Sequence, residues 1–284
     1  MNRDFEATIR TLTQPLNGQY PRPWLTRLAD PRQAKVFIVG KNQAKTFAVA
    51  EVGSHERFLD ALFNRHGQSC RGLYDRITGG RPSPTRTNTD RLVRLLERAG
   101  VREVLETNVI CYSTPLSEDL AKPIHLGGRQ RGDEIFRTLL AFIRPPVLIA
   151  HGADTRRILA KALGAELPEC PSSPAEAAAV RLDGPDYRPW VFVLPSLAPP
   201  AYNQWSRWAD GYMARLAQAV AERLGAREFP KAKVTTLSEP EPTLVAAPPR
   251  PVARAEAGPA SREGGGKTPP GPSDNWTGAF LRWF

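Results

Sequence analysis

Four apolar stretches of the sequence each lead to a side chain that can do chemistry. These side chains are, in chain order, Asn42, Asn108, His151 and Ser196. An amide donates and accepts hydrogen bonds at once, so it can bind the edge of a pyrimidine base or hold a water molecule. A histidine is easily tuned to titrate near neutral pH, and a serine hydroxyl can bind a phosphate. If the four meet in one place, they make a candidate site.

The apolar stretches have the pattern of buried strands. Residues 36–39, 104–110, 147–150 and 191–194 are rich in Val, Ile, Leu and Phe, as is typical of central strands in a parallel sheet. Between and after them, apolar residues recur at helical spacing in 55–63, 92–96, 133–142, 153–163 and 202–216. Ligands of open α/β sheets bind beyond the carboxyl ends of the strands. We therefore expect an α/β fold whose four strand ends converge on one crevice.

Other residues near the strand ends extend the candidate site. Lys41 and Gln43 lie on either side of the first asparagine and place polar groups where a substrate would sit, so both are candidate DNA contacts. Phe47, in the loop that follows, either stacks on a base or packs in the core, and the sequence favours neither reading. Tyr112, in the segment after the second strand, is a candidate for the pocket wall.

The stretch after the fourth strand and an arginine-rich segment offer contacts to nucleic acid. Leu197 or Tyr202 could wedge into a base stack, although helical spacing also suits Tyr202 to a core. Arg81 lies in residues 64–90, which are rich in Arg and lack clear periodicity. Such a segment suits phosphates, or is a flexible insertion without a ligand. His151 is either a hydrogen-bonding or electrostatic catalyst or a structural histidine.

Composition points to a polyanionic partner in a reducing compartment. The 284 residues include 39 Lys and Arg against 29 Asp and Glu, for a formal net charge of +10, which suits nucleic acid or is only a solvated basic surface. The three cysteines are far apart, which indicates neither a disulfide framework nor an iron–sulfur cluster. With no signal peptide and no membrane-spanning stretch in the sequence, we expect a cytoplasmic protein.

The order and chemistry of the strand ends resemble the uracil-DNA glycosylase superfamily. Its first motif, G-x-[D/N]-P-[Y/G], is matched by Gly-Lys-Asn-Gln-Ala at 40–44, and the asparagine is similar to that of the mismatch-specific and thymine-DNA branch. A strand asparagine that reads the base is matched at 108. The second motif, [H/N]-P-S followed by a loop that enters the minor groove, is matched by Leu-Pro-Ser at 194–196. The resemblance covers roughly residues 18–226.

The resemblance implies a three-layer α/β/α fold with a central, mostly parallel four-stranded sheet. It also implies a DNA glycosylase that flips a nucleotide, with Asn42 positioning water, Asn108 reading the base and Ser196 holding the backbone, and with neither metal nor cofactor. The first motif departs from the family at Gln43 and Ala44. The second has Leu194 where the family usually carries His or Asn to stabilise the departing base.

The altered motifs leave the substrate open. Uracil or thymine in mismatches is the conventional choice, and glucosylated hydroxymethylcytosine in phage DNA is one that family knowledge suggests. A catalytically silent DNA-binding or partner-recruiting protein on the same fold remains an alternative. A nucleotide or nucleoside hydrolase is a third, and it would not need the basic excess.

The C-terminal part of the chain has a different composition. We expect a catalytic domain over residues 1–228 and a Pro-, Ala- and Gly-rich disordered linker over 229–273, because the linker has almost no large apolar residues. Residues 274–284 restore aromatics, as in a short motif that catches a partner. They loosely resemble a sliding-clamp-binding peptide, or they fold back onto the domain.

Overall fold

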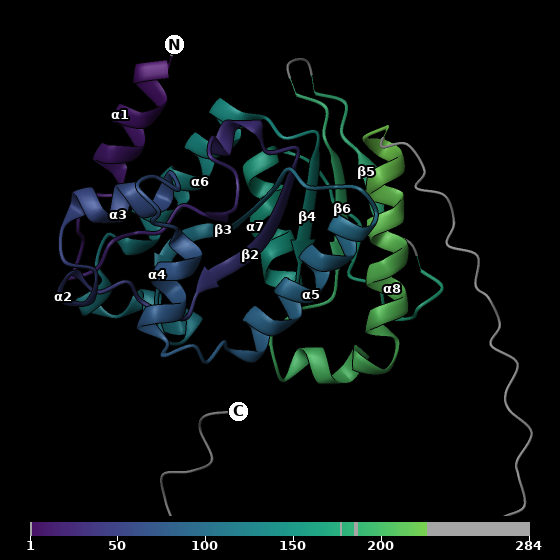
Figure 1. Cartoon of the computed structure of the whole chain (residues 1–284). Coiled ribbons are helices and arrows are strands. Elements are labelled where there is room, and N and C mark those ends of the chain that lie inside the picture. The colour runs from purple at the N-terminus through teal and green to yellow at the C-terminus, as the bar shows by residue number, and fades with distance from the viewer. Residues whose placement is uncertain (1, 177, 185–186, 226–284) are drawn as a thin grey trace, which may run out of the picture. The chain divides into compact units, whose positions relative to one another are not determined.

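A computed structural model of the chain describes residues 2–176, 178–184 and 187–225 (Figure 1). The predicted linker at 229–273 and the aromatic motif at 274–284 lie outside the described residues.

One sheet organises the described residues, and its strands run in the order β1-β3-β2-β4-β6-β5. The central neighbours β3, β2, β4 and β6 pair in parallel, and the edge strands β1 and β5 pair antiparallel. The α/β prediction is confirmed, but the sheet has six strands in place of the predicted four. The two extra strands are too short to leave a periodic signal in the sequence. The strands are β1 (Leu25–Thr26), β2 (Val36–Gln43), β3 (Val104–Ser113), β4 (Val147–His151), β5 (Ala179–Arg181) and β6 (Trp190–Leu194).

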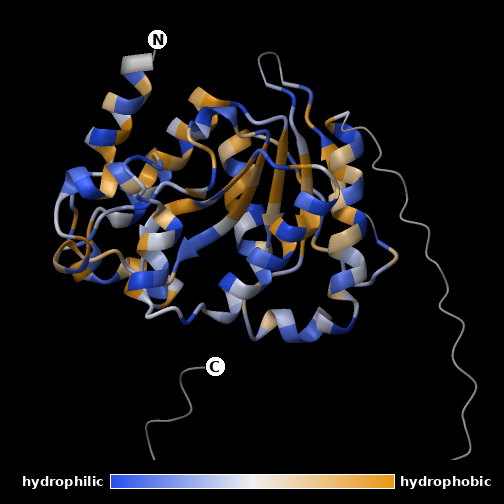
Figure 2. Ribbon diagram, in the orientation of Figure 1, coloured by the Kyte–Doolittle hydropathy of each residue, from blue (hydrophilic) through white to orange (hydrophobic). Residues whose placement is uncertain are grey.

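Apolar side chains project from both faces of the sheet, because successive strand residues point to opposite sides. In β2, Phe37 and Val39 belong to one buried cluster, which draws on α1, α3, α4, α6 and α7. Val36 and Ile38 belong to a second, which draws on α5 and α8. The orange strands of Figure 2 therefore lie between two helical layers. The helices are α1 (Asn2–Leu12), α2 (Val49–Val52), α3 (His55–Leu62), α4 (Cys70–Ile77), α5 (Pro84–Arg98), α6 (Gly128–Ile143), α7 (Ala153–Leu163) and α8 (Ala201–Arg223).

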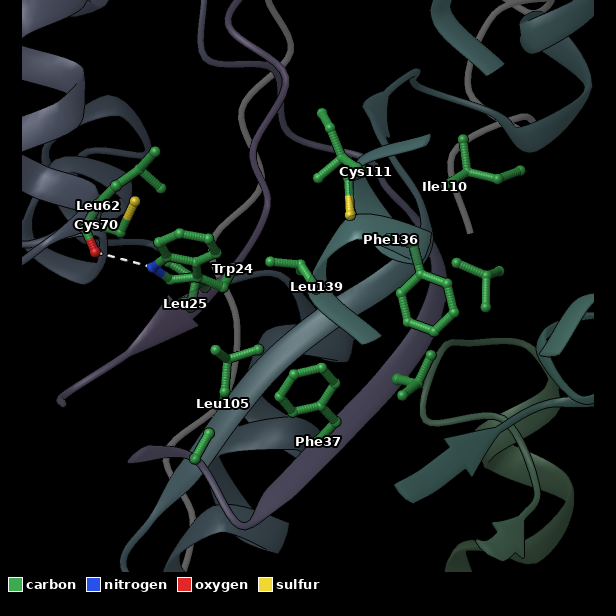
Figure 3. Packing of buried hydrophobic residues seen from close by; sticks show 14 of the residues in the cluster. Trp24, Leu25, Phe37, Leu62, Cys70, Leu105, Ile110, Cys111, Phe136 and Leu139 are labelled. Atoms are coloured by element: carbon green, nitrogen blue, oxygen red, sulfur yellow. Dashed lines mark hydrogen bonds between the residues drawn. The ribbon is translucent and has the colours of Figure 1, made fainter. Parts of the chain in front are cut away.

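The first cluster fixes the N-terminal segment against the sheet (Figure 3). Trp24 is buried and its Nε1 donates a hydrogen bond to the carbonyl of Leu62, 2.8 Å away. Phe37 and Leu105 come from neighbouring strands, and Phe136 comes from α6. Trp24 is thus a buried anchor between α3 and the sheet.

Two local predictions were wrong. Residues 64–90, predicted to be irregular, contain α4 and the first turns of α5, which Ser69 and Ser83 cap. Helix α5 begins at Pro84, well before the predicted helical spacing at 92–96, and Asn88 is buried inside it. Strand β2 also continues past its predicted end at residue 39, so that Asn42 is a strand residue, and β3 continues from its predicted end at 110 to Ser113.

Candidate functional site

A cavity of about 820 Å³ opens at the carboxyl ends of the parallel strands, and all four predicted strand-end side chains line it. Asn42 comes from β2, Asn108 from β3, His151 from β4, and Ser196 follows β6. The topology explains the convergence, because parallel neighbours end at the same edge of a sheet.

Gly40 makes the closest part of this convergence possible. It is the register partner of Asn108 in the β2–β3 pair. A Cβ atom placed on Gly40 would lie 2.6 Å from Asn108 Oδ1 and 2.9 Å from His151 Nε2. The two polar tips therefore meet over a position that has no side chain, and any larger residue would push them away.

The amide of Asn42 is held in one orientation from both ends. Its Nδ2 donates to Thr114 Oγ1 at 2.9 Å, and its Oδ1 accepts from Ser117 Oγ at 2.7 Å. Each bond uses half of that atom's capacity, because an amide nitrogen carries two hydrogens and the oxygen two lone pairs. Asn42 can therefore still bind a water molecule or ligand in a fixed direction.

Asn108 has free hydrogen-bonding capacity. Its side chain is partly exposed to the cavity and makes no hydrogen bond within the described part of the chain. Its backbone carbonyl accepts from Cys111 Sγ at 3.1 Å. An unpaired amide at a cavity wall is suited to bind the edge of a ligand that has both donors and acceptors.

His151 is held neutral. Burial and the positive charge of Arg86 lower the pKa of His151 to about 4, so the ring is uncharged at neutral pH. The backbone N–H of Leu197 donates to Nδ1 at 3.5 Å, which assigns the ring proton to Nε2. Nε2 is the atom that lies over Gly40. The site therefore holds an uncharged N–H donor beside Asn108.

An ionic network that was not predicted from the sequence borders the cavity, and its members Arg86 and Glu106 line the wall. Arg86, on α5, pairs with Asp90 at 2.8 Å and with Glu106, on β3. Arg71 also pairs with Asp90, at 2.8 Å. The i, i+4 spacing of Arg86 and Asp90 was a usable signal. So was the i, i+2 spacing that puts Glu106 on the same strand face as Asn108.

The cavity wall is net positive. Its cationic side chains outnumber its anionic ones five to two: Arg22, Lys41, Lys45, Arg81 and Arg86 against Glu106 and Asp154. Lys41 is paired with Asp154 at 2.6 Å, whereas Arg81 is exposed and makes no ion pair within residues 2–176, 178–184 and 187–225. Such a wall favours an anionic ligand.

Several predicted site residues lie outside the cavity. Phe47 is fully buried, with the Arg22 guanidinium 4.6 Å from its ring centre, so it is a core residue and not a stacking platform. Tyr112 is also fully buried, and its hydroxyl accepts from Asn17 Nδ2 at 3.0 Å. Neither lines the cavity, because the extended β3 and the loop after β2 turn these rings into the first cluster.

The predicted DNA contacts also separate into two groups. Lys41, Ser196 and Arg81 line the cavity. Leu197 is fully buried in the second cluster, and Tyr202 packs edge-on against Trp205 away from the cavity wall. Gln43 reaches the cavity wall, but its side chain is buried and Nε2 donates to the carbonyl of Arg22 at 2.7 Å. We therefore withdraw Leu197 and Tyr202 as wedges and Gln43 as a DNA contact.

Cys70 and Cys111 are packed in the core and are not suited to act as nucleophiles. Burial raises the pKa of Cys70 to about 12 and that of Cys111 to about 11, so both stay as thiols.

In the described ranges, no cluster of three or more His, Cys, Asp or Glu side chains is placed to hold a metal ion. No described helix has the length and apolarity needed to cross a bilayer.

Comparison with known proteins does not add to this geometry. No protein-family model matches the sequence, and no curated protein matches it.

Proposed function

We propose that the protein is a DNA glycosylase, which flips a pyrimidine nucleotide out of DNA and hydrolyses its N-glycosidic bond. One observation carries the proposal: two asparagine amides and a neutral histidine converge at the carboxyl ends of three parallel strands, in a cavity with a positive wall. A base edge needs paired donors and acceptors, and the DNA backbone needs positive charge.

In the proposed reaction, Asn42 holds the water molecule and Asn108 binds the base edge. Water adds to C1′ of the deoxyribose, and the electron pair of the C1′–N bond leaves with the base. The sugar carbon takes the hydroxyl group, and the second proton of the water goes to the departing base or to solvent. The products are an abasic site and a free base, so hydrolysis needs no co-reactant besides water.

His151 supplies a group that the second motif lacks. Leu194 occupies the position where the resembled family usually carries His or Asn, and it is fully buried. His151 is the register partner of Leu194 in the β4–β6 pair. A neutral Nε2–H from the neighbouring strand can therefore donate to the base oxygen as negative charge develops on it.

The sheet order is compatible with the proposed fold family. Numbered along the chain, the four central strands lie in the order second, first, third, fourth. We propose that this core is a uracil-DNA glycosylase-like layout to which the short strands β1 and β5 have been added.

The cavity has room for more than an unmodified base. Its 820 Å³ lies toward the upper end of the range of about 300–1,000 Å³ that holds drug-sized ligands. The wall also carries the hydroxyls of Thr78, Thr85 and Thr89, which retain acceptor capacity, and the carboxylate of Glu106, which pairs with Arg86. Such groups suit a bulky, hydroxylated substituent, which favours glucosylated hydroxymethylcytosine over uracil or thymine as the base.

The test is incubation of the purified protein with three DNAs, followed by alkali to cut abasic sites. The DNAs are a uracil duplex, a G·T mismatch duplex, and phage DNA with glucosylated cytosines. We expect the wild-type protein to cut the modified DNA and Asn42→Ala not to cut it. The matched control, Asn203→Ala, changes an exposed residue of α8 and should cut as wild type does. Tight DNA binding without cutting of any substrate would favour a silent binder. Hydrolysis of free nucleosides alone would favour a nucleoside hydrolase.

A further inference from the structure

A flipped nucleotide leaves a gap in the base stack, which DNA-binding proteins commonly fill with an apolar side chain. The two residues predicted for this task cannot do it as placed. Leu197 is fully buried, and Tyr202 does not line the cavity. If the proposed function is correct, the apolar group must come from another element.

The segment between β3 and α6 exposes large apolar side chains beside the cavity. Of the described residues, four large apolar side chains are well exposed: Leu116 at 55%, Ile124 at 71%, Leu126 at 79% and Phe142 at 40%. Three of the four lie within residues 116–126, and only Leu116 lines the cavity. This concentration needs an explanation, because the core does not require these side chains.

The backbone of Leu116 is fixed on both sides. Its N–H donates to Asp119 Oδ2 at 3.0 Å, and its carbonyl accepts from Thr114 Oγ1 at 2.7 Å. Asp119 is in turn paired with Lys122 at 2.6 Å. An apolar side chain on a rigid backbone can enter a base stack without a large loss of conformational entropy.

Residues 114–117 are hydrogen-bonded to Asn42, which we propose holds the water molecule. Thr114 and Ser117, on either side of Leu116, make both hydrogen bonds to the Asn42 amide. The position of Leu116 is therefore coupled to the position of Asn42 through two hydrogen bonds. Arg81 and Lys45, the latter paired with Glu51 at 3.6 Å, also line the cavity and supply positive charge that suits phosphates.

We propose that Leu116 is the wedge: it enters the duplex as the target nucleotide leaves and stabilises the flipped state. This inference rests on the proposed glycosylase function and names the element that makes it act on duplex DNA. Ile124 and Leu126, which are more exposed but do not line the cavity, would not fill the gap.

The experiment compares excision from duplex and single-stranded forms of the same oligonucleotide. We expect Leu116→Ala to reduce single-turnover excision from the duplex by about tenfold or more and to leave excision from the single strand within about twofold, because a single strand has no stack to fill. Leu116→Phe should restore the duplex rate, and Ile124→Ala should behave as wild type. A 2-aminopurine beside the target should brighten on wild-type binding and stay dim with Leu116→Ala.

The outcomes separate the wedge from the glycosylase. If wild type excises a base but Leu116→Ala has the wild-type duplex rate, or loses both rates equally, the wedge is wrong and the glycosylase stands. If Ile124→Ala lost as much duplex excision as Leu116→Ala, the assignment of Leu116 as the wedge would also be wrong. If wild type excises nothing from either form, the proposed function fails and the wedge fails with it.

Discussion

Replacing Gly40 by alanine should separate activity from stability. A Cβ atom at this position would lie 2.6 Å from Asn108 Oδ1 and 2.9 Å from His151 Nε2, where ordinary contact begins at 3.4 Å. The difference requires the amide tip to move by about 0.8 Å and the imidazole tip by about 0.5 Å. Because misplacement of reacting groups by about 1 Å can reduce a rate about 100-fold, we expect a loss of that order in excision.

The fold should tolerate the same change. The three nearest atoms are tips of side chains and not backbone, so they can move without shifting β2. Crowding in a packed site costs about 1–3 kcal/mol. The reduced freedom of the unfolded chain returns about 0.4–1 kcal/mol. The free energy of unfolding should therefore fall by between about 0 and about 2.6 kcal/mol.

The assay is single-turnover excision together with urea unfolding of Gly40→Ala and a matched variant. Gly211→Ala, in the interior of α8, places a Cβ no closer than 3.5 Å to a side-chain nitrogen. It should keep wild-type excision and gain stability. A Gly40→Ala protein that folds and excises at the wild-type rate would refute the convergence of Asn108 and His151 as the basis of the chemistry.

Three further predictions follow from the charges and thiols. The pKa of His151 is about 4 in the folded state, below its usual value of 6.5. Between these two pH values the unfolded chain binds a proton that the folded chain does not, so the free energy of unfolding falls as the pH falls. Urea titrations should therefore show a larger loss of stability between pH 6.5 and pH 4 for wild type than for His151→Gln. Arg86→Ala leaves Glu106 without its buried partner and should lower the free energy of unfolding by about 3–5 kcal/mol, whereas Arg86→Met with Glu106→Leu should recover most of it. Cys70 and Cys111, with pKa values raised to about 12 and 11, should resist iodoacetamide at pH 8 until urea is added, as mass spectrometry would show. The His151 assignment would be contradicted if the stability of His151→Gln had the same pH dependence as that of wild type. The Arg86 assignment would be contradicted by an unchanged free energy of unfolding in Arg86→Ala, and the burial of the thiols by their rapid alkylation in the native protein.

The sequence was sufficient to predict the four central strands and the convergence of their carboxyl ends, but not the residues at which β2 and β3 end. Each of Asn42, Asn108, His151 and Ser196 lies in or just after a largely apolar run, and a parallel sheet brings the ends of such runs to one edge. The number of strands was not accessible, because β1 and β5 are only two and three residues long. Residues 64–90 looked irregular because they contain only the short α4 and the first turns of α5, and the serines that cap these helices resemble loop residues.

The aromatic and apolar members of the site could not be assigned in this way. Phe47, Tyr112 and Leu197 follow polar motifs, and a ring or a leucine in such a place can face a ligand or the core with the same local sequence. Tertiary packing decides between the two, and here it buries all three. The pairing of Arg86 with Glu106 joins a helix to a strand far apart in the chain, so no local pattern reports it.

The most direct test of the central claim is detection of both products in one reaction. Wild type and Asn108→Ala would be incubated with DNA containing glucosylated hydroxymethylcytosine, the free base measured by chromatography, and the abasic sites measured with an aldehyde-reactive probe. We predict equal amounts of base and abasic site from wild type, and a loss of both in Asn108→Ala while DNA binding remains. Release of neither product from this DNA or from uracil or G·T duplexes, by a folded protein that binds DNA, would contradict the glycosylase assignment.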